Sequence, residues 1–185
     1  MFPSHDRSSS NDGHGLFVDG PDSNAGHCTQ LDCSSNGKWG VYNSSFLGNT
    51  YLACHVATNG SEETVTNITQ ANPGVVTTST THGWATGDEI YLENIVGMTE
   101  ANDAFYTITV LTTTTFSIAT DTSGYTAYSS GGNAYKGGAY RDDDANSRNV
   151  FVGCYAETDN RPSHLIAPSV VIGGLHSAGF CNAGS

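Results

Sequence analysis

The sequence predicts an all-β protein in which a short parallel β-helix, or solenoid, is interrupted by a small antiparallel barrel or sandwich. Composition is the first indication, because Gly and Thr each occur 22 times in 185 residues whereas Lys occurs only twice. Long helices favour Ala, Leu, Glu, Lys and Arg, so this composition favours many short strands joined by tight turns. The other two indications are a repeat centred on cysteine and an abrupt change of composition inside the chain.

The repeat consists of three segments that align on a cysteine, residues 28–37, 49–60 and 149–160. Their central residues are Cys33, Cys54 and Cys154, which are 21 and 100 positions apart. A spacing of 21 corresponds to about one coil of a solenoid, in which each coil stacks its short strands on the neighbouring coils. The longer gap is too long for one coil, and it therefore predicts an insertion between the second and third repeats.

Residues 62–135 have the character of that insertion. They contain eight acidic residues, no Lys or Arg and none of the five cysteines. Alternating strand patterns separated by turn residues occupy 64–70, 74–79, 88–95, 105–111 and 115–120. Five or six strands at this spacing predict a small barrel or sandwich. We therefore expect an inserted domain at 62–135 and a discontinuous β-helix at 1–61 and 136–185.

The aligned cysteines are predicted to face the solenoid interior. Along a strand such as residues 150–154, successive side chains alternate between interior and exterior. Stacked coils place equivalent residues above one another, so Cys33, Cys54 and Cys154 are expected to form a buried core ladder. Free thiols are favoured over disulfides, because five cysteines leave one unpaired and the sequence shows no secretion signal.

The inserted segment carries a recognisable set of residues: His82-Gly83, Gly87-Asp88, Gly97-Met98, Asn102, Tyr106 and Phe116-Ser117. In these positions it resembles the small β-barrel of the first catalytic cysteine half-domain of ubiquitin-activating enzymes, and relatives of that module recur in bacteriophage structural proteins. The resemblance implies a barrel. It does not imply ubiquitin activation, because the segment has no cysteine and no nucleotide-binding domain accompanies it.

The flanking segments carry a different pattern, formed by Asn149, Phe151, Cys154, Tyr155 and Glu157 and half repeated by Asn49, Tyr51 and Cys54. This pattern is similar to the coils of right-handed parallel β-helices in phage tailspikes and tail fibres. The resemblance implies a homotrimer in the virion tail, assembled in the host cytoplasm. It also implies contact with other virion tail proteins and with polysaccharide on the host surface.

The charge balance restricts the other partners. The chain has 18 Asp and Glu against 6 Lys and Arg, a net charge of −12. A phosphate backbone is bound chiefly by clustered Lys and Arg, so we expect no nucleic acid partner. No run of 18 apolar residues is present, so we expect no membrane insertion.

The sequence argues against a zinc site. The residue types that bind zinc are present at His27, Cys28, Cys33, Cys54 and His55. However, the closely paired cysteines of a structural site are missing, and adjacent residues such as Cys54 and His55 point to opposite faces of a strand. We expect neither a metal nor another cofactor.

Sugar recognition is the leading functional hypothesis, because aromatic rings stack on sugar rings while amides and hydroxyls bond to sugar hydroxyls. The candidate glycan-binding residues are Trp39, Tyr42, Trp84, Tyr125 and Tyr128. Ordinary core packing is the alternative role for each of them. The chain would then be a tail fibre or tailspike module for attachment to the host.

Two other functions stay open. A tailspike that cleaves polysaccharide would need two carboxylates facing one groove, and Asp143 and Glu157 are the candidates. The acidic run of residues 142–144 could supply such carboxylates or chelate a cation, but a run of this kind is more often a solvated turn. Alternatively, the protein decorates a capsid or baseplate and makes no contact with the host.

Overall fold

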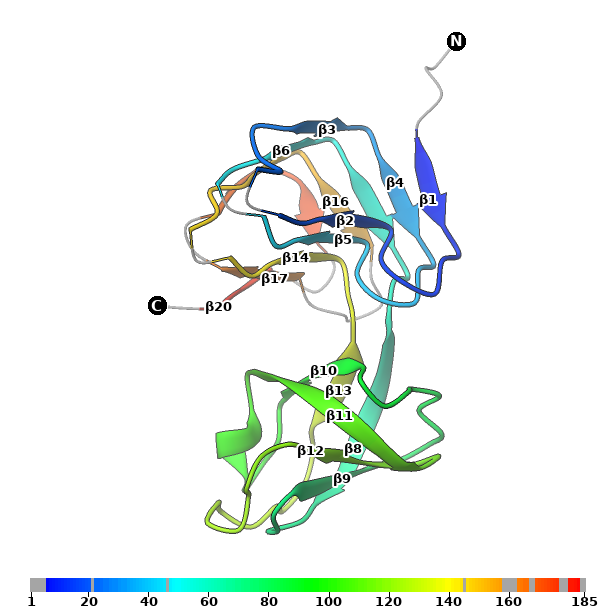
Figure 1. The fold of residues 1–185 in the computed structure, drawn as a ribbon, viewed down its shortest axis with the longest axis vertical. Coiled ribbons are helices and arrows are strands. Elements are labelled where there is room, and N and C mark those ends of the chain that lie inside the picture. Colours follow the sequence, from blue (N-terminus) through cyan, green and yellow to red (C-terminus); the bar gives the residue numbers. More distant parts are fainter. Residues whose placement is uncertain are drawn as a thin grey trace. The chain divides into compact units, whose positions relative to one another are not determined.

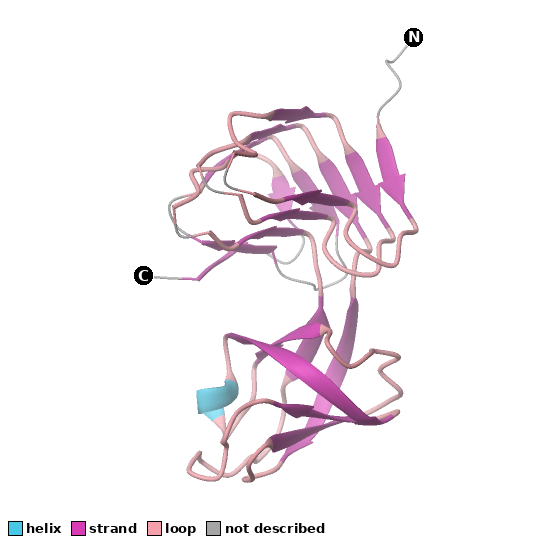
Figure 2. Cartoon of the chain, viewed as in Figure 1, coloured by secondary structure: helices cyan, strands magenta, loops and turns pink. Residues whose placement is uncertain are grey.

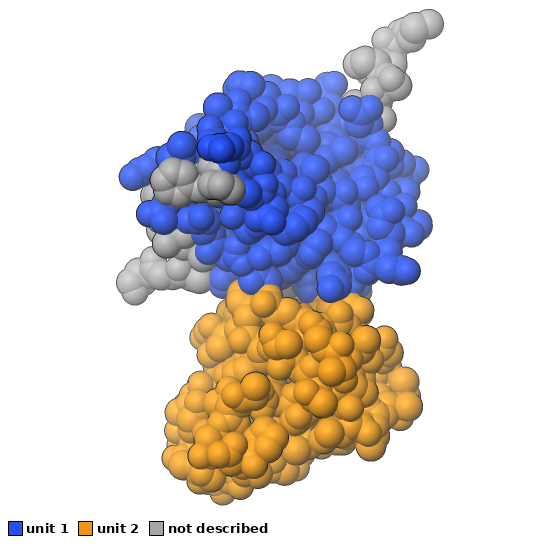
Figure 3. All heavy atoms as spheres, in the orientation of Figure 1, with its two compact units in different colours: residues 1–60, 137–185 blue, residues 61–136 orange. Residues whose placement is uncertain are grey.

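Two compact units make up the chain (Figure 3). The computed structural model describes residues 6–20, 22–45, 47–144, 146–157, 163–166, 169–176 and 180–183. Residues 61–136 form one unit, and residues 1–60 with 137–185 form the other. Within the described ranges the regular elements are strands, apart from the 3-10 turn η1 (Thr99–Ala101) (Figure 2). No helix in these ranges is long and apolar enough to cross a membrane.

The first unit is a solenoid of three parallel sheets (Figure 1), as predicted. The chain visits the sheets in turn, so each strand pairs in parallel with a strand one coil away. The first sheet contains β1 (Arg7–Ser9), β4 (Asp32–Ser34), β7 (His55–Ala57), β16 (Tyr155–Glu157) and β19 (Leu175–His176). The second contains β2 (Leu16–Val18), β5 (Val41–Asn43), β14 (Tyr140–Asp142), β17 (Ser163–Ile166) and β20 (Phe180–Ala183). The third contains β3 (His27–Thr29), β6 (Thr50–Leu52), β15 (Val150–Val152) and β18 (Val170–Ile172).

Single residues in the left-handed conformation turn the chain from one sheet to the next. After the strands of the third sheet, this position is held by Gln30, Ala53, Gly153 and Gly173, with φ between 50° and 63°. The turning N–H donates to the adjacent coil, as from Ala53 to the carbonyl of Val152 at 2.9 Å. The turn therefore recurs in each coil, and it costs about 1–2 kcal/mol where the residue is not glycine.

Asparagine side chains bridge successive coils at the turns. Asn36 Nδ2 donates to Asn59 Oδ1 at 2.8 Å, and Asn36 Oδ1 accepts from the side chain of Asn11 at 2.9 Å. In a second turn, the backbone N–H of Asn49 donates to Asn149 Oδ1 at 2.7 Å. Buried polar groups must be hydrogen-bonded, and these amides supply partners where the sheet ladders stop.

Equivalent side chains stack in rows inside the solenoid. Tyr51 and Phe151 face each other in β6 and β15, with ring centroids 4.9 Å apart and an interplanar angle of 10°. Cys54 and Cys154 follow these strands at equivalent positions, and each is 1% exposed. The rows produce one buried cluster of aromatic, aliphatic and thiol side chains.

The position of Cys33 corrects the predicted ladder. β4 pairs with β7 so that Cys33 stands opposite Val56, 23 positions later, and not opposite Cys54. Cys33 still belongs to the same buried cluster as Cys54 and Cys154. The alignment was wrong here because it matched residue type, whereas hydrogen-bond register determines which residues are equivalent.

The second unit is a closed antiparallel barrel with the strand order β10-β11-β12-β9-β8-β13 (Figure 1). Its strands are β8 (Ser61–Ile68), β9 (Gly74–Thr78), β10 (Glu89–Glu93), β11 (Ala104–Thr112), β12 (Thr115–Ile118) and β13 (Asn133–Lys136). Five of them overlap the predicted strand patterns. The sixth, β13, closes the barrel by pairing with both β8 and β10.

Apolar side chains fill the barrel. Phe116, Met98 and Ile90 are fully buried, and Trp84 packs on Phe116 with ring centroids 5.6 Å apart. The cluster contains no cysteine and no charged residue. The barrel is therefore stabilised chiefly by the burial of apolar surface.

The insertion occupies one turn of the solenoid. Gly60 donates its N–H to the carbonyl of Asn36 at 2.7 Å, and Gly40 donates to the carbonyl of Gly138 at 2.9 Å, so the chain leaves and re-enters beside the same neighbouring coil. The ends of the inserted unit lie side by side, because Ser61 pairs with Lys136. A whole domain can therefore be accommodated without changing the register of the coils.

Candidate functional site

An aromatic platform lies on the outer face of the second sheet. Phe17 of β2 and Tyr42 of β5 are paired in register, and their ring centroids are 5.0 Å apart. The His14 ring lies 5.4 Å from Phe17 and 5.0 Å from Tyr42. Phe17 is 51% exposed, so the platform presents an apolar ring to solvent. We define the aromatic platform as these three residues together with Arg141 and Asp143.

Arg141 and Asp143 provide the polar edge of the platform. Arg141 pairs with Tyr42 in register, and its guanidinium lies 4.7 Å from the centre of the tyrosine ring. Asp143 Oδ2 accepts from Arg141 Nη2 at 2.7 Å and from the Tyr42 hydroxyl at 2.8 Å. A cation stacked on the ring and a carboxylate bonded to its hydroxyl hold Tyr42 in one orientation.

The platform carries no net charge near neutral pH. Burial, reinforced by the charges of Lys38 and Arg141, lowers the pKa of His14 to about 4. The neutral imidazole accepts the backbone N–H of Trp39 at Nδ1, at 3.3 Å. The one cation and the one carboxylate of the platform are paired with each other, so a ligand would meet rings and hydrogen-bonding groups that together carry no net charge.

This arrangement has the chemistry that carbohydrate recognition requires. A sugar ring has an apolar face that packs on an aromatic side chain, and its hydroxyls both donate and accept hydrogen bonds. Phe17 offers the exposed ring. The Asp143 carboxylate, whose side chain is 23% exposed, offers acceptor oxygens at the edge.

The structure separates the five aromatic residues that the sequence singled out. Trp39 and Trp84 are 4% and 6% exposed, so both are packing residues. Tyr125 and Tyr128 are half-buried against the barrel core, and the Tyr128 hydroxyl donates to the carbonyls of Val65 and Gly131. Tyr42 is the one of these five that lies in the platform, while the Trp39 ring lies under the Arg141 guanidinium, 5.7 Å from ring centre to Cζ.

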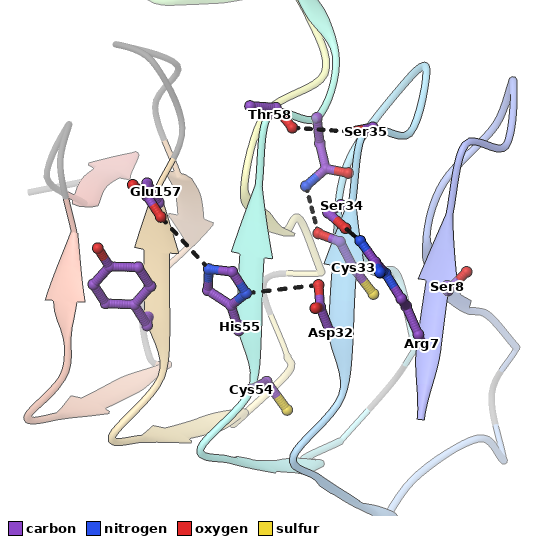
Figure 4. A network of polar contacts seen from close by, with 12 residues as sticks. Arg7, Ser8, Asp32, Cys33, Ser34, Ser35, Cys54, His55, Thr58 and Glu157 are labelled. Atoms are coloured by element: carbon purple, nitrogen blue, oxygen red, sulfur yellow. Dashed lines mark hydrogen bonds and ion pairs between the residues drawn. The ribbon is translucent and has the colours of Figure 1, made fainter. Parts of the chain in front are cut away.

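A second polar array occupies the outer face of the first sheet (Figure 4). His55 of β7 stands between two carboxylates, with Nδ1 3.6 Å from Asp32 Oδ1 and Nε2 3.9 Å from Glu157 Oε2. The ring of Tyr155 stacks on His55 with centroids 5.2 Å apart. We call Asp32, His55, Tyr155 and Glu157 the histidine–carboxylate row. It lies beside a cavity of about 220 Å³ that is lined in part by Asp32 and His55.

The two acids proposed as a catalytic pair do not share a groove. Glu157 lies on β16 in the first sheet, whereas Asp143 follows β14 in the second sheet and is engaged by Arg141 and Tyr42. The acid that shares a face with Glu157 is Asp32. The sequence pattern could not show this, because sheet membership depends on how the coil folds.

Sequence reasoning also missed Phe17, His14 and Arg141. The available signal was the coil repeat itself, since residues 14–18 precede residues 39–43 by one coil. An alignment extended to the first coil would have placed Phe17 beside Tyr42. Arg141 follows in the next coil of the same row, displaced in sequence by the insertion.

The residues considered for zinc are not gathered as ligands. Cys54 is buried in the solenoid interior, while His55, the next residue, faces outward toward Asp32. Among the side chains that the structure describes, no three His, Cys, Asp or Glu residues form a group that could hold a metal ion.

Comparison with known families finds a match to part of the chain. Residues 71–136 match the family described as the Ubiquitin-activating enzyme E1 FCCH domain. The matched segment is the barrel without its first strand, β8, and it confirms the resemblance predicted for this part of the chain. No curated protein matches the sequence.

The residues that carry this resemblance have structural roles in the barrel. His82 accepts the N–H of Trp84 at Nδ1, at 3.0 Å, and Asn102 exchanges two hydrogen bonds with the backbone of Ile95. Gly97 has a φ of 91°, and a Cβ there would lie 2.3 Å from the carbonyl oxygen of Ala127. The similarity therefore concerns the fold of the barrel and transfers no activity.

Proposed function

We propose that this chain binds carbohydrate through the aromatic platform, as a module of a bacteriophage tail fibre or tailspike that attaches to glycans on the host surface. The observation that carries the proposal is the half-exposed Phe17 ring, set in register beside Tyr42 and edged by the Arg141–Asp143 pair. A sugar face would pack on Phe17 while its hydroxyls bond to the polar edge.

The virion setting is supported by two resemblances noted in the sequence. The coil pattern is similar to that of phage tailspikes and tail fibres, and barrels like residues 71–136 recur in phage structural proteins. The net charge of −12 disfavours nucleic acid as the alternative ligand. Other tail proteins of the virion are the partners that this proposal implies.

The test is a binding measurement on the full chain with a panel of neutral and acidic surface polysaccharides, followed by calorimetry on any ligand found. Phe17→Ala is expected to weaken binding at least about tenfold, which corresponds to about 1.4 kcal/mol. Leu111→Ala is the matched control, because Leu111 is a similarly exposed apolar residue, at 52%, in the barrel.

Two results would overturn the proposal. One is equal loss of affinity in Phe17→Ala and Leu111→Ala, which would place the ligand elsewhere. The other is no binding to any polysaccharide in the panel, which would favour the decoration of a capsid or baseplate.

A second function is favoured by the histidine–carboxylate row. Asp32 and Glu157 flank His55 on one solvent-exposed face, and glycoside hydrolysis uses two carboxylates on opposite sides of the scissile bond. In this proposal one of the two carboxyl groups protonates the leaving-group oxygen and the other activates water.

The polysaccharide-cleaving function is tested by incubating the full chain with each bound polysaccharide and measuring its chain length. Shortening should disappear in Asp32→Asn and in Glu157→Gln and persist in Asp143→Asn, since Asp143 lies on another sheet. Binding without shortening would reject this second function and leave the first intact.

Self-association is proposed at the outer face of the third sheet. Leu52, Val170 and Ile172 are 44%, 48% and 54% exposed there, and none of the strand residues of this sheet is Asp, Glu, Lys or Arg. Copies of an acidic chain repel each other, so an uncharged aliphatic face is where they can meet. We propose that copies meet at this face as a homotrimer, the assembly that the resemblance to tailspikes implies.

Sedimentation of the full chain at micromolar concentration tests the assembly. Trimers are expected for the wild type and for Leu111→Asp, whereas Leu52→Asp is expected to give monomers. A monomeric wild type, or a trimer that survives Leu52→Asp, would contradict this interface.

A further inference from the structure

The N-terminal end of the solenoid contains an open cavity of about 490 Å³. Strands β1, β2 and β3 each lie at the edge of their sheet, so among the described residues no coil covers the interior of the first coil. Leu16, Leu31 and Tyr51 line the apolar part of this cavity, and Cys28 belongs to the same wall. The Cys28 side chain is partly exposed and lines this cavity.

Cys28 lies against a second thiol from the next coil. Its Sγ is 3.8 Å from Cys54 Sγ, and Cys54 Sγ is also 3.6 Å from the backbone carbonyl of Cys28. Cys54 lies at the turn that precedes β7 (Figure 4) and is 1% exposed. The Cys28 sulfur is thus partly exposed, and the buried Cys54 sulfur lies in van der Waals contact with it.

The thiols of Cys28, Cys33 and Cys54 differ in pKa. A hydrogen bond from Cys54 lowers the pKa of Cys28, and this effect outweighs burial. Burial raises the pKa of Cys33 to about 12. Cys54 is hydrogen-bonded to Cys154, which lowers its pKa, but donation to Cys28 and burial bring the pKa to about 11. The accessible thiol is therefore also the most readily ionised of these three. The thiolate is the form that reacts as a nucleophile, so Cys28 is expected to be the most reactive of them.

We propose that Cys28 is a thiol-modification site, which reacts with low-molecular-weight disulfides entering the cavity and passes the oxidation to Cys54. In the first step the Cys28 thiolate attacks one sulfur of the reagent, the reagent's S–S bond breaks, and a thiolate leaves and takes up a proton. In the second step Cys54 loses its proton and attacks the Cys28 sulfur, and the second thiolate is expelled and protonated. The two protein thiols are oxidised to one disulfide, and the reagent is reduced to two thiols.

The product would join the first coil covalently to the second. Cys28 lies in β3 and Cys54 follows β6, and these strands are paired neighbours. The disulfide would link the first described coil of the solenoid to the next one. Whether it forms would depend on the ratio of thiols to disulfides in the surrounding solution.

The first test measures thiol reactivity in the folded, reduced full chain. After a short exposure to iodoacetamide, the protein is denatured, its remaining thiols are blocked with an isotopically distinct reagent, and it is cleaved before aspartate. Cys28 is then alone in residues 22–31, Cys33 and Cys54 share 32–87, Cys154 is in 144–158 and Cys181 is in 159–185. Cys28 is expected to be labelled at least about tenfold faster than Cys33, Cys54 or Cys154; equal rates would overturn the proposal.

The second test identifies the disulfide partner, with glutathione disulfide as the reagent. The wild type is expected to give residues 22–31 joined to 32–87, and dithiothreitol should separate them. Cys33→Ser should still give the joined species, whereas Cys54→Ala should keep glutathione on residues 22–31. A joined species in a folded Cys54→Ala variant, or neither product in the wild type, would contradict the proposal. Unfolding curves show which variants fold. If Cys54→Ala does not fold, Cys33→Ser decides, because Cys54 is then the one cysteine in residues 32–87.

Discussion

The solenoid and the barrel bury their interiors in different ways. The barrel closes on itself, so every strand has two neighbours, and its core is a compact apolar cluster. The solenoid stacks coil on coil, and among the described residues its first and last strands in each sheet have one neighbouring strand. Among the residues whose burial the structure describes, fifteen polar or charged ones are buried, of which twelve lie in the solenoid and three, Thr78, His82 and Thr122, in the barrel. The solenoid therefore depends on side-chain hydrogen bonds to an extent that the barrel does not.

The difference follows from the turns. A barrel hairpin pairs most of its backbone N–H and C=O groups within its own strands. In the solenoid, strands of three residues leave more than half of each coil in turns. Asparagine amides that reach from coil to coil fill this gap. Each unit has one tryptophan, Trp39 in the solenoid and Trp84 in the barrel, so variants that retain one tryptophan report on one unit at a time.

The largest expected effect tests whether the two cores are independent. Phe116→Ala should destabilise the barrel by about 3–5 kcal/mol, because it leaves a cavity in the apolar core. Denaturant unfolding followed by Trp84 fluorescence should shift, while the Trp39 transition stays unchanged. Phe151→Ala should produce the reverse pattern. Coincident shifts of both tryptophans would show that the units unfold as one.

The next effect tests the role of the asparagine ladder. Asn36→Ala removes bonds to Asn11, Asn59 and the carbonyl of Ser8, and it should cost about 2–3 kcal/mol in the Trp39 transition. Asn102→Ala in the barrel is the control, because that amide bonds to one residue, Ile95, at two backbone atoms. If Asn36→Ala costs less than Asn102→Ala, the contrast between the units is wrong.

A smaller effect concerns acid stability. The pKa of His14 is about 4 in the folded chain, below its ordinary value of 6.5, so between these pH values the unfolded chain binds the proton and the folded chain does not. Stability should therefore fall as the pH is lowered from 7 to 4, by about 1–2 kcal/mol after solvent screening. Unfolding curves at both pH values should show this extra loss in the wild type relative to His14→Gln. An equal loss in both would remove His14 as the cause.

The smallest expected effect compares one substitution in the two units. Ala53 has a φ of 50°, where glycine is unstrained, so Ala53→Gly should stabilise the solenoid by about 0.5–1 kcal/mol. Ala134→Gly, within strand β13, should destabilise the barrel by about 1 kcal/mol. Opposite shifts of the Trp39 and Trp84 midpoints are the measurement, and a loss at both sites would mean that the left-handed turn carries no strain.

Much of the fold could be read from local patterns. Alternation predicted five of the barrel strands, and the change in charge marked the inserted region. The sequence did not predict the strand β13, because residues 133–136 are too few to show an alternating pattern. Its pairing with β8 and β10 defines it. The sequence predicts a coil of about 21 residues from the spacing of Cys33 and Cys54, whereas the register of β4 and β7 gives 23 residues. The two cysteines resemble each other but do not occupy equivalent positions.

The candidate site was less predictable than the fold. Tyr42 was recognised as an aromatic residue that could bind a sugar, but the same reasoning selected Trp84, which fills the barrel core. The exposure of a side chain depends on which face of the strand it lies on, and the residue type alone does not show this. Phe17 and Arg141 lie 124 positions apart in the sequence, and only the stacking of their strands on β5 makes them neighbours.

The sequence by itself determined that the chain is all-β, that it repeats, and that a second unit interrupts the repeat, because periodicity and composition are local properties of the chain. The tertiary structure alone decided which residues stand above one another, since one step of register moves every side chain of a strand to the other face. The pairing of Cys28 with Cys54, of Phe17 with Tyr42 and of His55 with two carboxylates follows from that register.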